Sequence, residues 1–138
     1  MADAFRHSIR VRYGECDAQG VVFNANWLGY FDILMTELFR ERVPGGYNAM
    51  LAEHGVDMVV AEATLRLLGP ARFDDDVDFE VTITRLGNTA LSTHIEAAVG
   101  GSPVASGDMR HVFVDPSTKA KTAMPDHVRE GLEPLQVA

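Results

Sequence analysis

The chain has 138 residues, of which 46% are hydrophobic and 23% are charged, a profile that indicates one soluble globular domain over residues 1–138. A formal net charge of −8 argues against nucleic-acid binding. With Cys16 as the single cysteine, no intrachain disulfide can form. The sequence also lacks a signal-peptide pattern and an apolar run of membrane-spanning length, so we expect a cytoplasmic protein that does not span a membrane.

The N-terminal residues predict a strand that leads into a turn. From Phe5 to Tyr13, apolar residues alternate with arginines, which is the period of a half-buried strand. The polar segment 14–20 that follows has the composition of a turn.

A long and unusually apolar helix is expected next. Asn24 and Asn26 both have side chains suited to capping its first turn, and the Pro-Gly-Gly segment at 44–46 ends it. Its broad apolar stripe consists of Trp27, Leu28, Tyr30, Phe31, Ile33, Leu34, Met35, Leu38 and Phe39. Other elements must cover most sides of a helix with such a stripe.

Short turns join the remaining elements. In chain order we expect a helix at 47–54, strands at 56–68, 77–84, 91–99 and 103–115, and a closing helix at 126–132. Hairpin-length turns between consecutive strands require antiparallel pairing. The predicted fold class is therefore α+β, with an antiparallel five-stranded sheet wrapped around the long central helix.

Residues 13–27, Tyr-Gly-Glu-Cys-Asp-Ala-Gln-Gly-Val-Val-Phe-Asn-Ala-Asn-Trp, resemble the opening motif of the 4-hydroxybenzoyl-CoA thioesterase-like family of hot-dog fold acyl-CoA thioesterases. That motif has an aromatic residue, an acidic residue, the catalytic aspartate, a glycine three residues later, a short apolar run and an aromatic-rich helix. Residues 69–75 and 112–119 resemble two later stretches of the family. The resemblance implies a hot-dog fold and a homo-oligomer, dimer or tetramer, whose subunits pair edge to edge with the site at their interface.

By this resemblance Asp17 is the catalytic carboxylate, and it either attacks the thioester carbonyl or deprotonates water. The backbone N–H of Asn24, at the start of the helix, would polarise the carbonyl. Gly20 permits a positive φ or a close approach of substrate. Because relatives often carry Tyr or His at the position of Asn24, its side chain has three open roles: substrate contact, helix capping or tolerance of the turn.

Further site residues are expected from their positions. Those predicted to bind substrate are Val22, Phe23, Trp27 and Glu62, and those predicted to bind CoA are Arg72, Thr89, Ser117 and Lys119. Glu62 is also a candidate carboxylate, because a related thioesterase branch places its catalytic acid elsewhere in the fold. Trp27 would equally well fill the core, and an acid such as Glu62 more often faces solvent or a partner subunit. The five histidines show no metal-ligand spacing, so we expect neither a metal nor another cofactor.

The predicted function is hydrolysis of an aromatic or short- to medium-chain acyl-CoA to the free acid and CoA. The alternative is a non-hydrolytic hot-dog module that binds an acyl thioester or assembles with partners, with Asp17 as a structural turn residue. A dehydratase of the same fold is disfavoured, because no histidine occurs in the Asp17 turn or the helix. Cys16 is more simply a small turn or core residue than a nucleophile.

Overall fold

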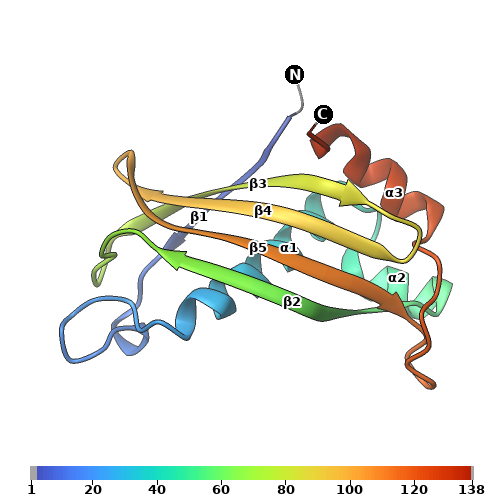
Figure 1. Cartoon of the computed structure of the whole chain (residues 1–138), viewed down its shortest axis with the longest axis horizontal. Helices are drawn as coiled ribbons and strands as arrows, with labels where there is room; N and C mark the ends of the chain where they lie inside the picture. The colour runs from blue at the N-terminus through green and yellow to red at the C-terminus, as the bar shows by residue number, and fades with distance from the viewer. Residues whose placement is uncertain (1–2, 138) are drawn as a thin grey trace.

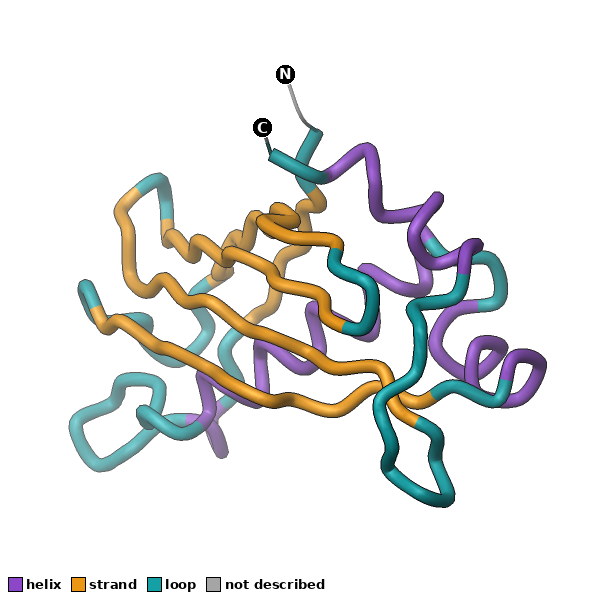
Figure 2. The backbone as a smooth tube through the Cα atoms, turned by 45° about the vertical axis from the view of Figure 1, so that its right-hand side comes forward, coloured by secondary structure: helices purple, strands orange, loops and turns teal. Residues whose placement is uncertain are grey.

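The computed structural model describes residues 3–137 and consists of one five-stranded antiparallel sheet with helices on one of its faces (Figure 1; Figure 2). The strands lie in the spatial order β1 (Phe5–Arg10), β3 (Asp76–Leu86), β4 (Ala90–Val99), β5 (Ser102–Val114) and β2 (Asp57–Leu67). The long helix α1 (Asn26–Arg42) runs along the sheet, and α2 (Gly46–His54) and α3 (Asp126–Leu132) lie at one end. The predicted α+β class with a central helix is confirmed.

Helix α1 forms the centre of the core. Its buried residues are Trp27, Tyr30, Phe31, Leu34, Met35, Leu38 and Phe39. Leu28 and Ile33, which the sequence pattern assigned to the same stripe, are exposed. At 100° per residue, Ile33 points away from the sheet. Leu28 shares the face of Met35, but it lies near the helix start, where nothing within the described chain covers it.

The N-terminal strand is shorter than its alternation predicted. Strand β1 ends at Arg10, and Tyr13 lies in a single 3₁₀ turn, Tyr13–Glu15, where its side chain is 82% exposed. The chain must turn here to reach the start of α1. The alternation of apolar residues therefore extends a few residues past the end of the strand.

Strand β2 forms one edge of the sheet. It pairs only with β5 within the described chain, which leaves a second, free edge along 11 residues. Its pairing with β5 passes from Val60 opposite His111 to Glu62 opposite Arg110, so Ala61 forms a β-bulge without a partner on β5.

Gly107 is a point of close contact between β5 and α1. A Cβ at this position would collide with the Phe31 ring and lie 2.7 Å from the carbonyl oxygen of Thr64. We expect Gly107→Ala to lower the free energy of unfolding by about 2 to 3 kcal/mol, because the ring and the backbone must both move. Urea titration measures this loss.

The matched control is Gly29→Ala in α1. A Cβ on Gly29 meets no atom within 4 Å. Alanine also favours the helix by about 1 kcal/mol over glycine. The control should therefore be as stable as the wild type or more so. Equal stability of Gly107→Ala and the wild type would contradict the packing described here.

Among residues 3–137, no helix has the length and the apolar character needed to cross a membrane.

Candidate active site

The segment between β1 and α1 folds into a small hairpin that carries Asp17. Cys16 and Val22 pair as an antiparallel bridge, and the N–H of Asp17 donates to the carbonyl of Val21 at 2.9 Å. The N–H of Gly20 donates to the carbonyl of Asp17 at 2.9 Å, and Gly20 has a φ of +79°. A glycine in this left-handed conformation closes a three-residue hairpin loop. The positive φ expected for Gly20 is thus present.

One oxygen of the Asp17 carboxylate is engaged and the other is open. Oδ1 accepts the N–H of Gln19 at 2.9 Å, forming an Asx turn that fixes the side chain. Oδ2 has no hydrogen-bond partner among residues 3–137. Asp17 lines an open cavity of about 540 Å³ together with Tyr13, Gly14, Cys16, Ala18, Gly20 and Phe73. Asp17 therefore combines a fixed side chain at a cavity wall with one oxygen that no described group engages.

Helix α1 begins after the hairpin without a side-chain cap. Its N-cap residue is Ala25, and the side chain of Asn26 instead donates to the carbonyl of Glu15 at 2.7 Å. The expected cap by Asn24 or Asn26 is therefore wrong. The backbone N–H groups of Asn24 and Ala25 donate no hydrogen bond to any described residue. With capping excluded, substrate contact and tolerance of the turn stay open for the Asn24 side chain.

A network around Glu15 ties the hairpin to α1, and no periodicity in the sequence indicates it. The Glu15 carboxylate accepts hydrogen bonds from the Arg12 N–H at 2.7 Å and from the hydroxyl of buried Tyr30 at 2.8 Å. It also pairs with the Arg12 guanidinium at 3.0 Å, and the Glu15 side chain is 16% exposed.

The pKa values follow from these contacts. Burial alone would raise the pKa of Glu15, but the hydrogen bonds from the Arg12 N–H, Tyr30 and the Arg12 guanidinium outweigh it and hold that pKa below its ordinary value. Burial, and next the Glu15 carboxylate, raise the pKa of the Tyr30 hydroxyl. The tyrosine therefore stays protonated and donates.

We expect Glu15→Gln to lower the free energy of unfolding at pH 7 by about 2 kcal/mol, because a charged acceptor of several hydrogen bonds is lost. The folded-state pKa of Glu15 is lowered, so its contribution is complete above about pH 4.3 and is lost as the pH falls through the folded-state value. The difference between wild type and variant should therefore shrink below about pH 4.

Urea titrations at pH 7 and in acid measure this difference. Glu80→Gln is the control, because Glu80 is exposed and its ion pair with Arg6 spans 3.4 Å between half-exposed side chains. That variant should change stability by less than about 0.5 kcal/mol. A Glu15→Gln effect that is equal at both pH values would contradict the assignment of a lowered pKa.

The three hydrophobic residues predicted to contact the acyl group differ in exposure. Phe23 is 51% exposed and follows the hairpin. Val22 is buried, and Trp27 is 2% exposed and packs edge-on against Phe79, with ring centroids 6.3 Å apart. Within one chain, Val22 and Trp27 are thus core residues, and only Phe23 is open to a ligand.

Arg72 lies beside the hairpin, whereas Glu62 does not. Arg72 forms a backbone bridge with Val21. Glu62 is exposed and lies opposite Arg110 of β5. Side chains alternate along a strand, and Gly107 faces α1, so Arg110 and Glu62 face away from α1. Within one chain the structure brings Arg72 to the hairpin and leaves Glu62 on the other face of the sheet.

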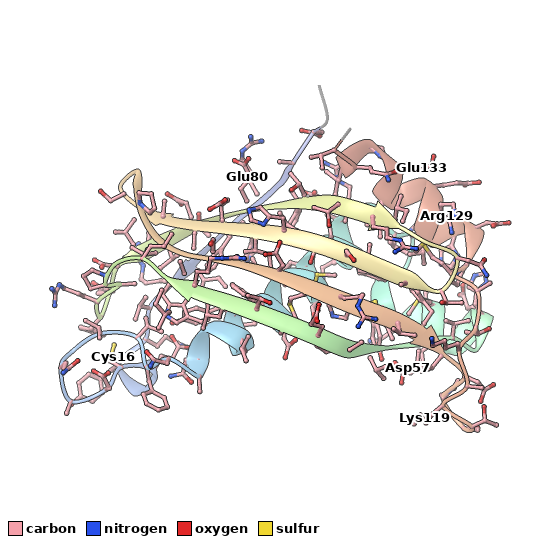
Figure 3. The ribbon with its side chains drawn as sticks, in the orientation of Figure 1. Cys16, Asp57, Glu80, Lys119, Arg129 and Glu133 are labelled. Carbon is pink, nitrogen blue, oxygen red and sulfur yellow. The ribbon has the colours of Figure 1, made fainter. Side chains whose placement is uncertain are left out.

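The other three predicted CoA contacts lie at the far end of the sheet. Thr89 lies between β3 and β4, and its carbonyl accepts a hydrogen bond from β5 at 2.9 Å. Ser117 and Lys119 lie in the turn after β5. Figure 3 shows Cys16 of the hairpin and Lys119 at opposite ends of the molecule. These three residues therefore do not share a cavity with Asp17 in a single chain.

A second cavity, of about 190 Å³, lies between α1, α2 and the sheet. It is lined by Asp32, Met35, Thr36, Phe39, Tyr47, Met58, Val60 and His111. His111 is 3% exposed, and its Nδ1 is buried without a hydrogen-bond partner among the described residues. Burial lowers the pKa of His111 to about 4, so the imidazole is neutral at pH 7. In the sequence, the only feature that singles out His111 is its place in the apolar last part of the strand expected at 103–115.

Within the described part of the chain, no three His, Cys, Asp or Glu side chains gather in a way that could hold a metal ion.

The fold defines the class of protein. A five-stranded antiparallel sheet wrapped around one long helix is the hot-dog fold. The structure matches that of a thioesterase-superfamily protein from Jannaschia sp. CCS1 with a TM-score of 0.89 at 21% identity, covering 98% of this chain and 94% of that one.

The sequence identifies the family. The profile of the thioesterase-like superfamily matches residues 11–132, and the chain belongs to that superfamily. It is 30% identical over 125 residues to the acyl-CoA thioester hydrolase YbgC of Escherichia coli, covering 90% of this chain and 92% of that protein. It is 26% identical over 133 residues to the 1,4-dihydroxy-2-naphthoyl-CoA hydrolase of Nostoc punctiforme, covering 94% and 87%. The family and the fold predicted from residues 13–27 are confirmed.

Proposed function

We propose that this member of the superfamily hydrolyses an acyl-CoA thioester to the free acid and CoA, with Asp17 as the catalytic carboxylate. The observation that carries the proposal is an aspartate that lines a cavity and is held there by an Asx turn, with its second oxygen unengaged by any of residues 3–137. A structural turn residue needs only Oδ1. The open Oδ2 is the additional group that the chemistry requires.

Two routes use this oxygen. In the first, Asp17 attacks the thioester carbonyl, the C–S bond breaks, CoA leaves as the thiol after taking a proton, and water hydrolyses the mixed anhydride. In the second, Asp17 takes a proton from water, the resulting hydroxide attacks the carbonyl, the C–S bond breaks, and CoA leaves as the thiol after taking a proton. Both routes place the oxygen of water in the products and need no cofactor.

The amides before α1 supply the second requirement, which is a donor for the charge that develops on the carbonyl oxygen. The N–H groups of Asn24 and Ala25 have no acceptor among the described residues, and the positive end of the helix dipole lies at this point. Loss of one such donor typically costs about 100- to 1000-fold in rate. The donors belong to the backbone, so the departure of Asn24 from the Tyr or His of relatives leaves this role intact.

We further propose that the complete site forms between two copies of the chain. Large apolar side chains are exposed on either side of the hairpin and at or shortly after the end of β2: Tyr13, Phe23, Leu67, Leu68 and Phe73. Tyr13 and Phe73 pack edge to face, with ring centroids 5.9 Å apart, and exposed apolar side chains that cluster are typical of interaction sites. The free edge of β2, which ends at Leu67, offers backbone groups that are unpaired within the described chain.

Antiparallel pairing of two β2 strands would unite the scattered site residues. The hairpin contacts residues 71–72, shortly after the Leu67 end of β2, whereas Lys119 lies near Asp57 at the other end (Figure 3). In a two-fold pair, the Asp57 end of one strand lies beside the Leu67 end of its partner. Asp17 of one protomer then approaches the turn after β5 of its partner, where CoA contacts are predicted.

Release of free thiol from a panel of aromatic and short- to medium-chain acyl-CoAs tests the activity. We expect turnover by the wild type on at least one class, in buffer with EDTA and no added cofactor. If the protein binds these thioesters but releases no thiol from any of them, the proposed hydrolysis is refuted. That result would favour the non-hydrolytic binding module.

A further inference from the structure

Residues 24–25, which carry the two free amides before α1, form what we call the donor segment. Both of its ends are tied to one atom, the carbonyl oxygen of Glu15. This oxygen accepts the backbone N–H of Phe23 at 2.9 Å and the side-chain Nδ2 of Asn26 at 2.7 Å. Phe23 directly precedes the donor segment, and Asn26 directly follows it. The position of the donor segment is therefore set relative to Glu15.

The carbonyl group of Glu15 lies two residues before Asp17 in the chain. Cys16, between them, forms the bridge with Val22 that closes the hairpin, and the Asp17 N–H donates to the carbonyl of Val21 at 2.9 Å. The Asx turn fixes the Asp17 side chain within the hairpin. The Asp17 carboxylate and the donor segment are thus both positioned from Glu15, one through the chain and the other through hydrogen bonds.

Asn26 supplies the one side chain that contacts this carbonyl within the described chain. It is the first residue of α1 and is partly buried. A carbonyl oxygen can only accept, so the amide nitrogen of Asn26 must face it. An asparagine at a helix start often caps the helix by accepting a backbone N–H, whereas this one donates to the segment that carries the hairpin. Its side chain therefore connects α1 to the hairpin.

The contacts that would survive without Asn26 show what its side chain adds. The N–H of Phe23 would still tie the front end of the donor segment to Glu15. The hydroxyl of Tyr30, one turn further along α1, would still donate to the Glu15 carboxylate at 2.8 Å. The helix as a whole would therefore stay in place, and movement would be confined to its start, where the free amides lie.

We propose that Asn26 is a positioning residue that holds the donor segment at a fixed distance from the Asp17 carboxylate. The inference rests on the proposed function and adds to it a residue that acts through the Glu15 carbonyl and takes no part in breaking the thioester. Hydrolysis needs the carboxylate on one side of the thioester carbon and the donors on its oxygen, so their separation matters. Misplacement by about 1 Å costs on the order of 100-fold in rate.

Two variants remove the side-chain donor in different ways. Asn26→Ala removes it without adding charge, and Asn26→Asp keeps the shape of the side chain but, as a carboxylate at pH 7, cannot donate. We expect kcat for thiol release to fall by about tenfold or more in both variants, with KM within about threefold of the wild type, because misplaced amides weaken the transition state more than substrate binding. Only the lost donor is common to both variants.

Thermal unfolding separates this role from a merely structural one. A negative charge suits the first turn of a helix, so Asn26→Asp should be as stable as the wild type while its kcat falls. Asn48→Ala is the control, because Asn48 is exposed near the start of α2 and its side chain makes no hydrogen bond to residues 3–137. Its kcat and KM should equal those of the wild type. A kcat within about twofold of the wild-type value in either Asn26 variant overturns the inference.

Order parameters of the backbone amides measure the same tie without any substrate. NMR relaxation should give about 0.85 for Asn24 and Ala25 in the wild type and below about 0.6 in Asn26→Ala, whereas Gln19 in the Asx turn stays rigid in both. Unchanged values in an active enzyme overturn the inference and leave the proposed function standing. Loosened amides, in a protein whose wild type hydrolyses no acyl-CoA, refute the proposed function and leave the positioning by Asn26 standing.

Discussion

Asp17→Asn is expected to lower kcat/KM for every acyl-CoA that the wild type hydrolyses by about 1000-fold or more. The asparagine carbonyl can still accept the N–H of Gln19, so the Asx turn that Oδ1 now makes at 2.9 Å survives. The variant loses the negative charge and the open oxygen, which the nucleophilic and the general-base route both need. Initial rates of thiol release over a range of acyl-CoA concentrations give the ratio.

Asp126→Asn is the control for this variant. It makes the same chemical change at an exposed aspartate in the first turn of α3, far from the hairpin. Its rate should equal that of the wild type, and thermal unfolding should show that Asp17→Asn is also folded. If Asp17→Asn retains more than about a tenth of the wild-type rate, the carboxylate is not catalytic.

Ala61→Pro is expected to convert the protein into a monomer. Its rate of thioester hydrolysis should be at most about one hundredth of the wild-type rate. Ala61 is the bulged residue of edge strand β2 and has no partner on β5, so a proline here spares the ladder within the chain. It removes an N–H and adds a ring on the free edge, which obstructs pairing with a second β2. If the partner completes the site, misplacement of even 1 Å costs on the order of 100-fold in rate.

Ala61→Ser keeps the N–H and should remain an active dimer or tetramer. Sedimentation velocity gives the oligomeric state of both variants, and circular dichroism checks that each retains its sheet. A fully active monomer, in either the variant or the wild type, would show that the site is complete in one chain.

Local patterns predicted the elements whose environment is uniform along their length. The strict alternation at 77–84 lies within β3, where Val77, Phe79, Val81 and Ile83 are all buried. The closing helix at 126–132 was predicted with its observed bounds. In both, one face meets the core from end to end, so periodicity alone is informative.

Local patterns could not predict the position of β2 in the sheet. Strand β2 precedes β3 in the chain, yet it pairs with β5 at the far edge of the sheet. Pairing between distant segments depends on the whole packing arrangement, and periodicity does not encode it. The exposure of Leu28 has a similar cause, because its helical position matches the buried face but no element within residues 3–137 covers it.

Some features of the candidate site could likewise be predicted from the sequence, whereas others could not. The resemblance of residues 13–27 to the family's opening motif pointed to Asp17 and Gly20, and the local geometry of both is set within a few residues. The link from Glu15 to Tyr30 and the buried imidazole of His111 arise between separate elements. Such contacts appear only when the chain is folded.

A single-turnover experiment tests the central claim most directly. Enzyme is mixed in excess over one acyl-CoA in water enriched in ¹⁸O, and the thiol, the free acid and the Asp17-containing peptide are quantified. Because one turnover suffices, a poor choice of acyl group still gives a signal. We predict equal amounts of CoA thiol and free acid, with ¹⁸O in the acid or in the Asp17 carboxylate. Recovery of intact acyl-CoA bound to the protein would contradict the proposed function.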